Sequence, residues 1–269
     1  MDEYRKSNRE LWNNWARMHF SSPTSNYDVA TFKAGRNTLH SVDLEELGDV
    51  AGKSLLHLQC HFGADTLSLA RLGARVTGVD FSSEAIAIAR QLSDELEIPA
   101  RFVQSDILAL PDVLDGQFDI VFTSHGVLGW LPDLRRWGEV VAHFLKPGGT
   151  FCLVEGHPFA HVFHGEPGVL EGRYPYFEQP EPLRFETKGS YGDPESDYES
   201  VEYYWSHSLS EIVNALLGAG LALVHLREFD FLSWQMGTNM EQGADGYWRL
   251  PAGYPPLPFM FALKAVKPG

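Results

Sequence analysis

Short apolar runs alternate with amphipathic segments through the middle of the chain. Runs rich in β-branched and aromatic residues predict strands at Lys53–Leu58, Arg75–Val79, Ala100–Val103 and Phe118–Thr123. A fifth strand is predicted at Thr150–Glu155. Strands that alternate with helices at this spacing indicate an α/β protein with a doubly wound, mostly parallel sheet.

Between these strands, apolar residues recur at the spacing of one face of a helix. The predicted helices are Asp65–Leu72, Ser83–Leu96 and Leu134–Phe144. Ser82 is expected to cap the second of them, because its hydroxyl can accept a hydrogen bond from a free amide at the helix start. Lys146–Gly149, which reads KPGG, is predicted to make a tight turn before the fifth strand.

The last part of the chain brings the predicted sheet to seven strands. A helix is predicted at Ser208–Gly220, followed by a sixth strand at Leu221–Glu228 and a seventh at Phe259–Val266. The loop Phe229–Pro258 between these two strands is rich in glycine, proline and aromatic residues.

No linker separates two halves of the chain, so we predict a single domain of 269 residues. Its predicted parts are an N-terminal helical cover (1–50), the core of the sheet (51–156), an inserted lid (157–205) and the C-terminal part of the sheet (206–269). The lid is inferred from composition. Glu155–Glu202 holds six prolines and eight Phe or Tyr residues, which favours loops and short strands over a long helix.

The chain is acidic, with a formal net charge of −15 from 21 Lys+Arg and 36 Asp+Glu. Phosphate groups would be repelled, so this balance argues against a protein that grips nucleic acid or an anionic membrane by bulk charge. Glu155–Glu202 alone carries 11 acidic and 3 basic residues. More than half of the excess charge therefore belongs to the predicted lid.

Composition also bounds the class of protein. Hydrophobic residues make up 44% of the chain and aromatic residues 13%, which suffices for a sizeable core and argues against intrinsic disorder. Two cysteines, Cys60 and Cys152, cannot build a disulfide framework. No signal peptide and no apolar run of about 20 residues is visible, so we expect a cytoplasmic protein.

Two aspartates stand where a nucleoside would bind. In a parallel sheet, ligands bind beyond the carboxyl ends of the strands. Asp80 ends the second strand, where an acidic residue can accept hydrogen bonds from both hydroxyls of a ribose. Asp106 ends the third strand, where a carboxylate can accept one from the exocyclic amine of adenine. Either aspartate alone would equally serve as a helix cap.

At this point the sequence resembles the class I methyltransferases that use S-adenosylmethionine, over roughly Lys53–Glu155. The matching motifs are LLHLQCHFGADTLSLARLGA, GVDFS, QSDIL, FDIVFTSHGVLGW and LKPGG. The resemblance implies a Rossmann-like, seven-stranded sheet whose last strand is antiparallel, with S-adenosylmethionine as cofactor. The residues expected to bind this cofactor are His57, Gln59, Cys60, His61, Gly63, Asp80, Phe81, Ser82, Ser105, Asp106, Ile107, Ser124 and His125.

The turn after the first strand departs from the family pattern, acidic-x-Gly-x-Gly-x-Gly. His57, Gln59 and His61 replace the acidic residue and the first two glycines, and Gly63 alone is kept. The acidic residue of the family helps to hold the methionine ammonium of the cofactor. Either that contact comes from elsewhere, or the cofactor binds weakly, or the ligand differs. Without the glycines the backbone cannot approach a pyrophosphate, which disfavours NAD.

Two histidines are the candidate catalytic residues. His125 follows the fourth strand and is expected near the transferred methyl, where an imidazole that titrates near neutral pH could act as a base. The alternative is that its ring packs on the adenosine or caps the next helix. His157, with Glu155, ends the fifth strand and is the second choice.

The predicted lid adds a metal alternative and an aromatic one. His157, His161 and His164 have the spacing of a zinc site on a helix, but nearby prolines argue against that helix, and we predict no metal. The acceptor is expected over the fourth and fifth strand ends, under the lid. Aromatic residues that could line its pocket are Tyr174, Tyr176, Phe177, Tyr203, Tyr204, Trp205, Trp234, Tyr247 and Trp248.

The leading hypothesis is therefore an enzyme that transfers a methyl group from S-adenosylmethionine to a small-molecule acceptor, either cationic or neutral. One alternative is a binding protein with the same fold that has lost catalysis, as the altered turn would permit. Another is an RNA or protein methyltransferase, which the net charge disfavours. Enzymes of this class that methylate nucleic-acid bases usually carry Asn-Pro-Pro-aromatic after the fourth strand, where this chain reads TSHG.

Overall fold

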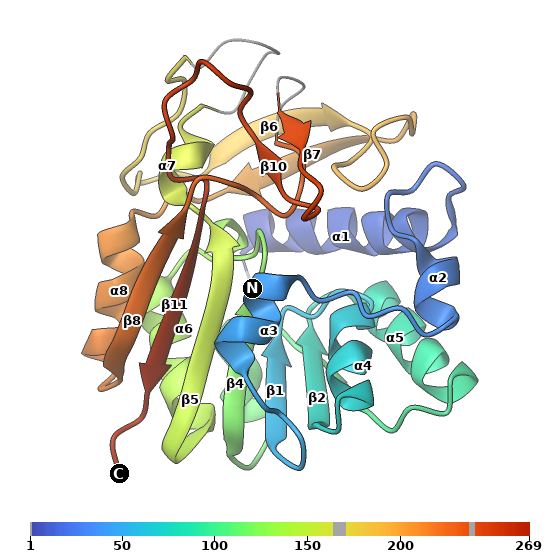
Figure 1. The fold of residues 1–269 in the computed structure, drawn as a ribbon, viewed down its shortest axis with the longest axis vertical. Helices are drawn as coiled ribbons and strands as arrows, with labels where there is room; N and C mark the ends of the chain where they lie inside the picture. The colour runs from blue at the N-terminus through green and yellow to red at the C-terminus, as the bar shows by residue number, and fades with distance from the viewer. Residues whose placement is uncertain (1, 164–170, 237–239) are drawn as a thin grey trace.

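A seven-stranded sheet runs through the centre of the computed structural model, which describes residues 2–163, 171–236 and 240–269. The strand order is β3-β2-β1-β4-β5-β11-β8 (Figure 1). All seven strands predicted from the sequence are present. Their bounds are β1 Ser54–Leu58, β2 Arg75–Asp80, β3 Arg101–Gln104, β4 Phe118–Ser124, β5 Leu145–Gly156, β8 Ala222–Phe229 and β11 Met260–Val266.

The direction of the strands confirms the expected fold. Strands β1 to β5 pair in parallel, whereas β11 is antiparallel to both β5 and β8. From β1 the chain builds outward to β2 and β3, and then returns to place β4 on the other side of β1. The strand order therefore reverses between β1 and β4, which is where such sheets bind ligands.

Helices cover both faces of the sheet. They are α4 (Ala64–Arg71), α5 (Ser83–Glu95), α6 (Leu134–Phe144) and α8 (Leu209–Gly218). Ser82 caps α5 as predicted, accepting a hydrogen bond from the amide of Ala85 at 3.1 Å. Two short 3₁₀ helices, η1 (Ile107–Asp112) and η2 (Leu128–Trp130), follow β3 and β4.

The KPGG segment was predicted to be a turn before the fifth strand, but the structure places it within that strand. Leu145 already pairs with Phe118 of β4, and pairing resumes between Thr150 and Ile120. The segment therefore bulges out of one continuous strand. Gly148 permits this with a φ of 76°, a value that residues with a Cβ adopt only at a cost.

Three helices from the first 50 residues pack against the rest, as expected. They are α1 (Glu3–Ser21), α2 (Val29–Lys33) and α3 (Ser41–Leu47). Figure 1 shows α1 crossing above the carboxyl ends of β1 and β2, while α3 lies beside β5. Leu11 and Trp15 of α1 are buried, so the helix is held by its apolar face.

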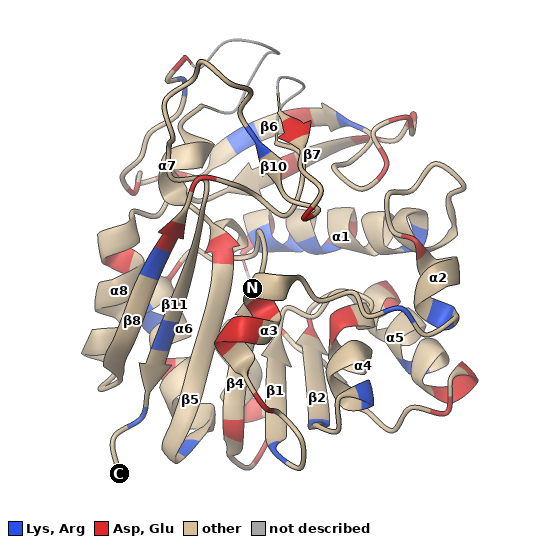
Figure 2. Ribbon diagram, in the orientation of Figure 1, with Lys and Arg blue, Asp and Glu red and all other residues tan. Residues whose placement is uncertain are grey.

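The insertion forms a short helix and a hairpin above α1. Its elements are α7 (Pro158–His161), β6 (Leu183–Lys188) and β7 (Glu199–Tyr204). Figure 2 shows both signs of charge on this hairpin. A last small pair, β9 (Glu241–Gln242) with β10 (Trp248–Arg249), lies in the loop before β11.

Asn8 ties α1 to the insertion. Its side-chain amide donates to the carbonyl of Tyr203 at 2.7 Å, and its carbonyl accepts from the amide of the same residue at 2.9 Å. Asn8 is fully buried, so both bonds form away from water. The helix above the strand ends and the hairpin above the helix are therefore joined by a two-point contact.

The core is divided between the two faces of the sheet. On the α6 and α8 face, Trp137, Phe144 and Phe151 are fully buried. Each such side chain contributes about 1.5–3 kcal/mol when it leaves water. None of the described helices is long and apolar enough to cross a membrane.

Candidate active site

The turn after β1 holds non-glycine residues in a conformation that favours glycine. Gln59 and His61 have φ values of 56° and 51°, in the left-handed region. Each costs about 1 kcal/mol or more, so surrounding contacts must hold them there. Gly63 has a φ of 79°, and a Cβ there would come within 2.7 Å of the Phe102 ring, which explains why this glycine is kept.

His57 is a structural residue between three elements. Its Nδ1 lies 2.9 Å from the hydroxyl of Thr66 on α4, and its Nε2 lies 3.1 Å from that of Ser124 on β4. Burial lowers the pKa of His57 to about 4, so the ring is neutral at pH 7. Both ring nitrogens and the Ser124 hydroxyl are used inside the protein, so the predicted cofactor contacts of these two side chains are not available in this arrangement.

Asp80 is a buried carboxylate that accepts only backbone amides. His61 donates to its Oδ2 and Ser82 to its Oδ1, both at 2.9 Å. Burial raises the pKa of Asp80 to about 6, although the two amides favour the charged form. Each oxygen keeps a lone pair, and no ion pair with a described cation forms. The residue therefore fits the predicted role of an acceptor for ribose hydroxyls.

Asp106 has both the capping role and a cation partner. Its Oδ1 accepts from the amide of Leu108 at 3.0 Å, at the start of η1. Its Oδ2 accepts from Arg5 of α1 at 2.8 Å. The alternative of a helix cap is thus confirmed, and contact with adenine stays a prediction. Beside it, the Ser105 hydroxyl donates to the Asp106 carbonyl, and Ile107 is buried.

Other predicted cofactor residues differ in what their side chains do. The Cys60 thiol packs against Gly78, behind the turn, and burial raises its pKa well above the ordinary value. The Ser82 hydroxyl donates to Asn13 of α1 as well as capping α5. The structure thus gives the side chains of Cys60 and Ser82 structural roles, while Phe81 is half-exposed at the end of β2.

Gln59, one of the predicted cofactor residues, supplies a neutral acceptor. Its side-chain amide donates to the carbonyl of Val127 at 2.9 Å, which orients the group. Its Oε1 is buried and has no hydrogen-bond partner. A buried acceptor without a donor is costly, so this oxygen suits a ligand that brings an N–H group. It stands beside His57, which cannot hold an ammonium.

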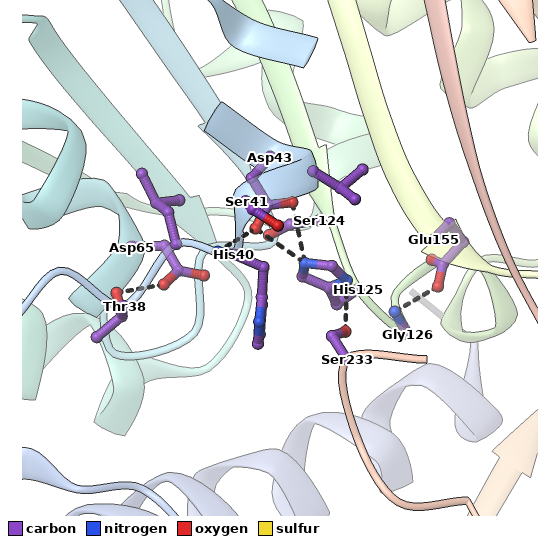
Figure 3. Close-up of polar contacts among 12 residues, drawn as sticks. Thr38, His40, Ser41, Asp43, Asp65, Ser124, His125, Gly126, Glu155 and Ser233 are labelled. Carbon is purple, nitrogen blue, oxygen red and sulfur yellow. Dashed lines mark hydrogen bonds and ion pairs between the residues drawn. The ribbon is translucent and has the colours of Figure 1, made fainter. Parts of the chain in front are cut away.

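His125 lies between a carboxylate and a hydroxyl. Its Nε2 is 3.0 Å from Oδ1 and 3.2 Å from Oδ2 of Asp43, and the hydrogen bond points to Oδ2 (Figure 3). Its Nδ1 lies 3.2 Å from the hydroxyl of Ser233. The residue has a φ of 38° and donates its amide to Val154 at 2.8 Å. It thus joins α3, the end of β4 and the loop after β8.

The protonation state of His125 differs from the one expected for a base. Burial alone would lower its pKa, but the Asp43 carboxylate outweighs burial and, with Asp65 and Glu155, raises the pKa to about 9. The ring is therefore a cation at pH 7, with both nitrogens occupied. In this arrangement the ring does not titrate near neutral pH and would have to lose its proton before it could act as a base. The catalytic role of His125 stays a prediction.

Glu155 organises the loop after β4. Its carboxylate accepts hydrogen bonds from the amides of Gly126, Val127 at 2.8 Å and Leu128 at 3.1 Å, and from its neighbour Gly156 at 2.7 Å (Figure 3). The side chain is buried. Because the carboxylate accepts hydrogen bonds from so many backbone amides, it fixes the loop that carries His125.

The second predicted catalytic residue, His157, caps α7. Its Nδ1 accepts from the amide of Phe159 at 3.0 Å, and its Nε2 lies 2.9 Å from a carboxylate oxygen of Glu228. Neither nitrogen is free, so a catalytic role is not supported. Of the histidines in the metal alternative, His164 lies outside the described residues. The described part of the chain holds no group of three metal-binding side chains.

An aromatic cluster closes the space between α1 and the turn. The ring centre of Trp12 is 5.4 Å from that of His61 and 5.3 Å from that of Trp130. On the other side, the hydroxyls of Tyr27 and Tyr191 are 2.6 Å apart. The helix therefore covers the predicted cofactor site with rings, although Trp12, Gln59 and His61 all keep partial exposure.

Residues 55–149 match the family model for a methyltransferase domain. The match runs from β1 into β5 and includes the strand ends that carry Asp80, Asp106 and His125. This segment is therefore similar to a methyltransferase domain. Within that segment, Gln59, His61 and His125 are three of the residues that adopt a positive φ without being glycine.

Relatives and solved structures agree with this assignment. An uncharacterized methyltransferase of Synechocystis sp. is 36% identical over 125 residues, which are 46% of this chain and 56% of the relative. A ubiquinone biosynthesis O-methyltransferase of Alkalilimnicola ehrlichii is 32% identical over 119 residues, 44% and 48% of the two chains. The chain thus spans about half the length of these curated relatives.

The fold is shared with a solved structure, an S-adenosylmethionine-dependent methyltransferase from Clostridium acetobutylicum. The TM-score is 0.59 at 13% sequence identity, and the similarity covers 96% of this chain and 100% of that one. At this identity the likeness concerns the fold alone. The expected seven-stranded sheet, with its antiparallel last strand, is confirmed.

Proposed function

We propose that this chain transfers a methyl group from S-adenosylmethionine to a small-molecule acceptor. The observation that carries the proposal is Asp80, a buried carboxylate with open lone pairs and no cation, at the ribose position of a segment that matches a methyltransferase domain. The similarity to a ubiquinone biosynthesis O-methyltransferase supports the same chemistry.

The residues of the turn fit the cofactor in a specific way. Asp80 would accept the ribose hydroxyls, and the open lone pairs of Asp106 would face adenine. Gln59 Oε1, which is buried without a donor, would accept from the methionine ammonium in place of the missing acidic residue. When bound, the cofactor supplies an activated methyl group. The chain's part is then to orient the two reactants and to exclude water.

His125 is proposed as a positioning residue. As a buried cation, held by Asp43 and Ser233, it fixes the loop after β4 and places positive charge beside the reaction site. This charge would favour an acceptor that carries an oxygen or nitrogen lone pair over a second cation.

The acceptor is proposed to be small, and the setting cytoplasmic. The net charge of −15 disfavours nucleic acid as a partner, and the loop after β4 lacks the Asn-Pro-Pro sequence of base methyltransferases. Both cysteines are buried free thiols, which suits a reducing compartment.

Two measurements test this proposal. Calorimetry of the purified chain with S-adenosylmethionine and S-adenosylhomocysteine should show binding of both, and absence of binding up to about 1 mM would overturn the cofactor assignment. Methyl-labelled cofactor should then label the small-molecule fraction of a cell extract. Label in the RNA or protein fraction alone, or binding without transfer, would replace the proposal with the corresponding alternative.

A further inference from the structure

A cavity lies where the ends of β4 and β5 meet the insertion. It is a small hollow that opens to solvent. Gly129 and Glu155 form part of its floor, and Tyr176, Tyr204 and Trp205 form part of its walls. The position agrees with the place expected for an acceptor, over the fourth and fifth strand ends.

The charged groups of the cavity disfavour a negative ligand. No lysine or arginine belongs to its lining among the residues that the structure describes. The Glu155 carboxylate in its floor already accepts four backbone amides. Burial lowers the pKa of His207, and its Nε2 donates to the carbonyl of Leu131 at 2.7 Å. An anionic ligand would therefore meet a carboxylate in the lining, while the charge of His125, outside the lining, is already matched by Asp43. This arrangement is unfavourable for a buried anion.

The walls present flat faces. A Cβ on Gly129 would come within 1.9 Å of Cε2 of Tyr204, so the ring lies directly on the glycine. The amide of Trp205 donates to the carbonyl of Gly129 at 2.8 Å, which anchors this wall to the loop after β4. Pro158 and Pro175 add further apolar surface. Aromatic rings pack well against such faces, in offset or edge-to-face contacts.

The same loop borders the predicted cofactor site. The ring centre of Trp130 is 6.3 Å from that of Tyr204 on the cavity side, and 5.3 Å from that of Trp12 under α1. Gln59 also donates to Val127 of this loop. A ring in the cavity and a nucleoside at the turn after β1 would therefore share one wall.

We propose that the cavity binds an uncharged, planar aromatic acceptor of the phenol or aromatic-amine class and rejects carboxylates and phosphates. This inference rests on the proposed function. In the transfer, a lone pair on the acceptor's oxygen or nitrogen forms the bond to the methyl carbon while the sulfur–carbon bond breaks. The electron pair stays on sulfur, which gives S-adenosylhomocysteine, and the acceptor's proton passes to water.

Three ligands of similar shape test the charge preference. Titrations of para-cresol, para-toluate and tolyl phosphate into the chain saturated with S-adenosylhomocysteine can be followed by tryptophan fluorescence, because Trp205 lies in the wall. We expect para-cresol to bind at least about tenfold more tightly than either anion.

Substitutions at two glycines test where the ligand binds. Gly129→Ala should weaken para-cresol binding about tenfold or more and leave S-adenosylhomocysteine binding unchanged, because the new methyl group displaces Tyr204. Gly218→Ala is the matched control, since a Cβ there meets open space on α8. Ser206→Arg places a cation in the lining and should raise toluate affinity about tenfold.

The outcomes separate the two proposals. If S-adenosylhomocysteine binds and an anion binds as tightly as para-cresol, the acceptor class is wrong while the cofactor assignment stands. Unchanged para-cresol binding in Gly129→Ala would place the ligand elsewhere and also overturn the inference. If S-adenosylhomocysteine does not bind at all, the proposed function fails first, and the acceptor inference falls with it.

Discussion

An aspartate at each end of the central sheet has a shifted pKa, but the two shifts have opposite directions. At the amino end, Asp119 of β4 accepts from the amide and hydroxyl of Ser54 and from the ammonium of Lys146 at 2.8 Å. These partners hold the pKa of Asp119 well below its usual range. At the carboxyl end, Asp80 accepts from backbone amides, and burial raises its pKa to about 6.

The contrast distinguishes a carboxylate that stabilises the fold from one kept ready for a ligand. The charge of Asp119 is matched within the protein, so ionisation favours the folded state. The charge of Asp80 is disfavoured by its surroundings, and left-handed backbone at Gln59 and His61 adds further cost beside it. Unmatched charge and backbone strain thus gather at one end of the sheet, as is usual for binding sites.

The largest expected effect comes from Asp80→Ala. Its loss removes the acceptor for two ribose hydroxyls, and we expect the dissociation constant for S-adenosylmethionine to rise about 100-fold or more. Calorimetry measures this change, and circular dichroism checks that the fold is kept. Asp115→Ala, an exposed aspartate before β4, is the control that should bind normally. Equal affinity of Asp80→Ala and the parent chain would remove Asp80 from the ribose role.

The second effect is a loss of stability at alkaline pH caused by His125. Its pKa of about 9 lies above the ordinary 6.5, so its contribution is fully present below pH 6.5 and is lost as the pH rises through 9. Each pKa unit is worth about 1.4 kcal/mol. The free energy of unfolding, measured in urea at pH 6.5 and at pH 9, should therefore differ by roughly 2–3 kcal/mol because of this group. Asp43→Asn should abolish that difference. An unchanged pH slope in the variant would show that Asp43 does not set the charge of His125.

Asp119→Ala should lower stability and leave cofactor affinity nearly unchanged, which is the reverse of the effect expected for Asp80→Ala. It removes the hydrogen bonds with Ser54 and Lys146, both partly exposed, so we expect unfolding free energy to fall by about 1–2 kcal/mol. Affinity for S-adenosylmethionine should stay within about twofold, because the residue lies at the other end of the sheet. A large loss of affinity with normal stability would contradict the division between the two ends.

A pH dependence of cofactor binding should follow from Asp80 alone. Below pH 6 its carboxyl group takes up a proton in the free protein, and that proton must leave before both ribose hydroxyls can donate. We expect affinity to fall by up to about tenfold per pH unit below 6, and to be nearly constant between pH 7 and 8. Asp80→Asn should lack this dependence, which calorimetry across pH 5–8 would reveal.

Most of the fold could be predicted because its signals are local. Apolar periodicity located β1, β2 and α6 to within a residue or two, and Ser82 marked the start of α5. The KPGG segment misled because glycine and proline signal a reversal of the chain, whereas pairing with β4 on both sides makes it a bulge in β5. That pairing depends on a neighbouring strand, which the local sequence does not contain.

The site was predictable in part for the same reason. Asp80 was found from its place at the end of the second strand, but the partner of His125 lies 82 residues away, on α3. No local pattern marks Asp43 as that partner, so the raised pKa of His125 could not be predicted from the sequence. Glu155 was noted as a strand end, yet its hold on the Gly126–Leu128 amides depends on the packing of β5 against β4.

The smallest effect we argue concerns Gln59, the neutral acceptor of the strained turn. Gln59→Ala should weaken S-adenosylhomocysteine binding about five- to tenfold, because one hydrogen bond to the methionine ammonium is lost. Methylthioadenosine, which lacks the amino-acid end, should bind the variant and the parent chain equally. Asp80→Ala provides the contrast, since it should weaken both ligands. Equal weakening of both by Gln59→Ala would mean that the side chain only shapes the turn. In that case the ammonium has another partner, and the departure of this turn from the family pattern is structural.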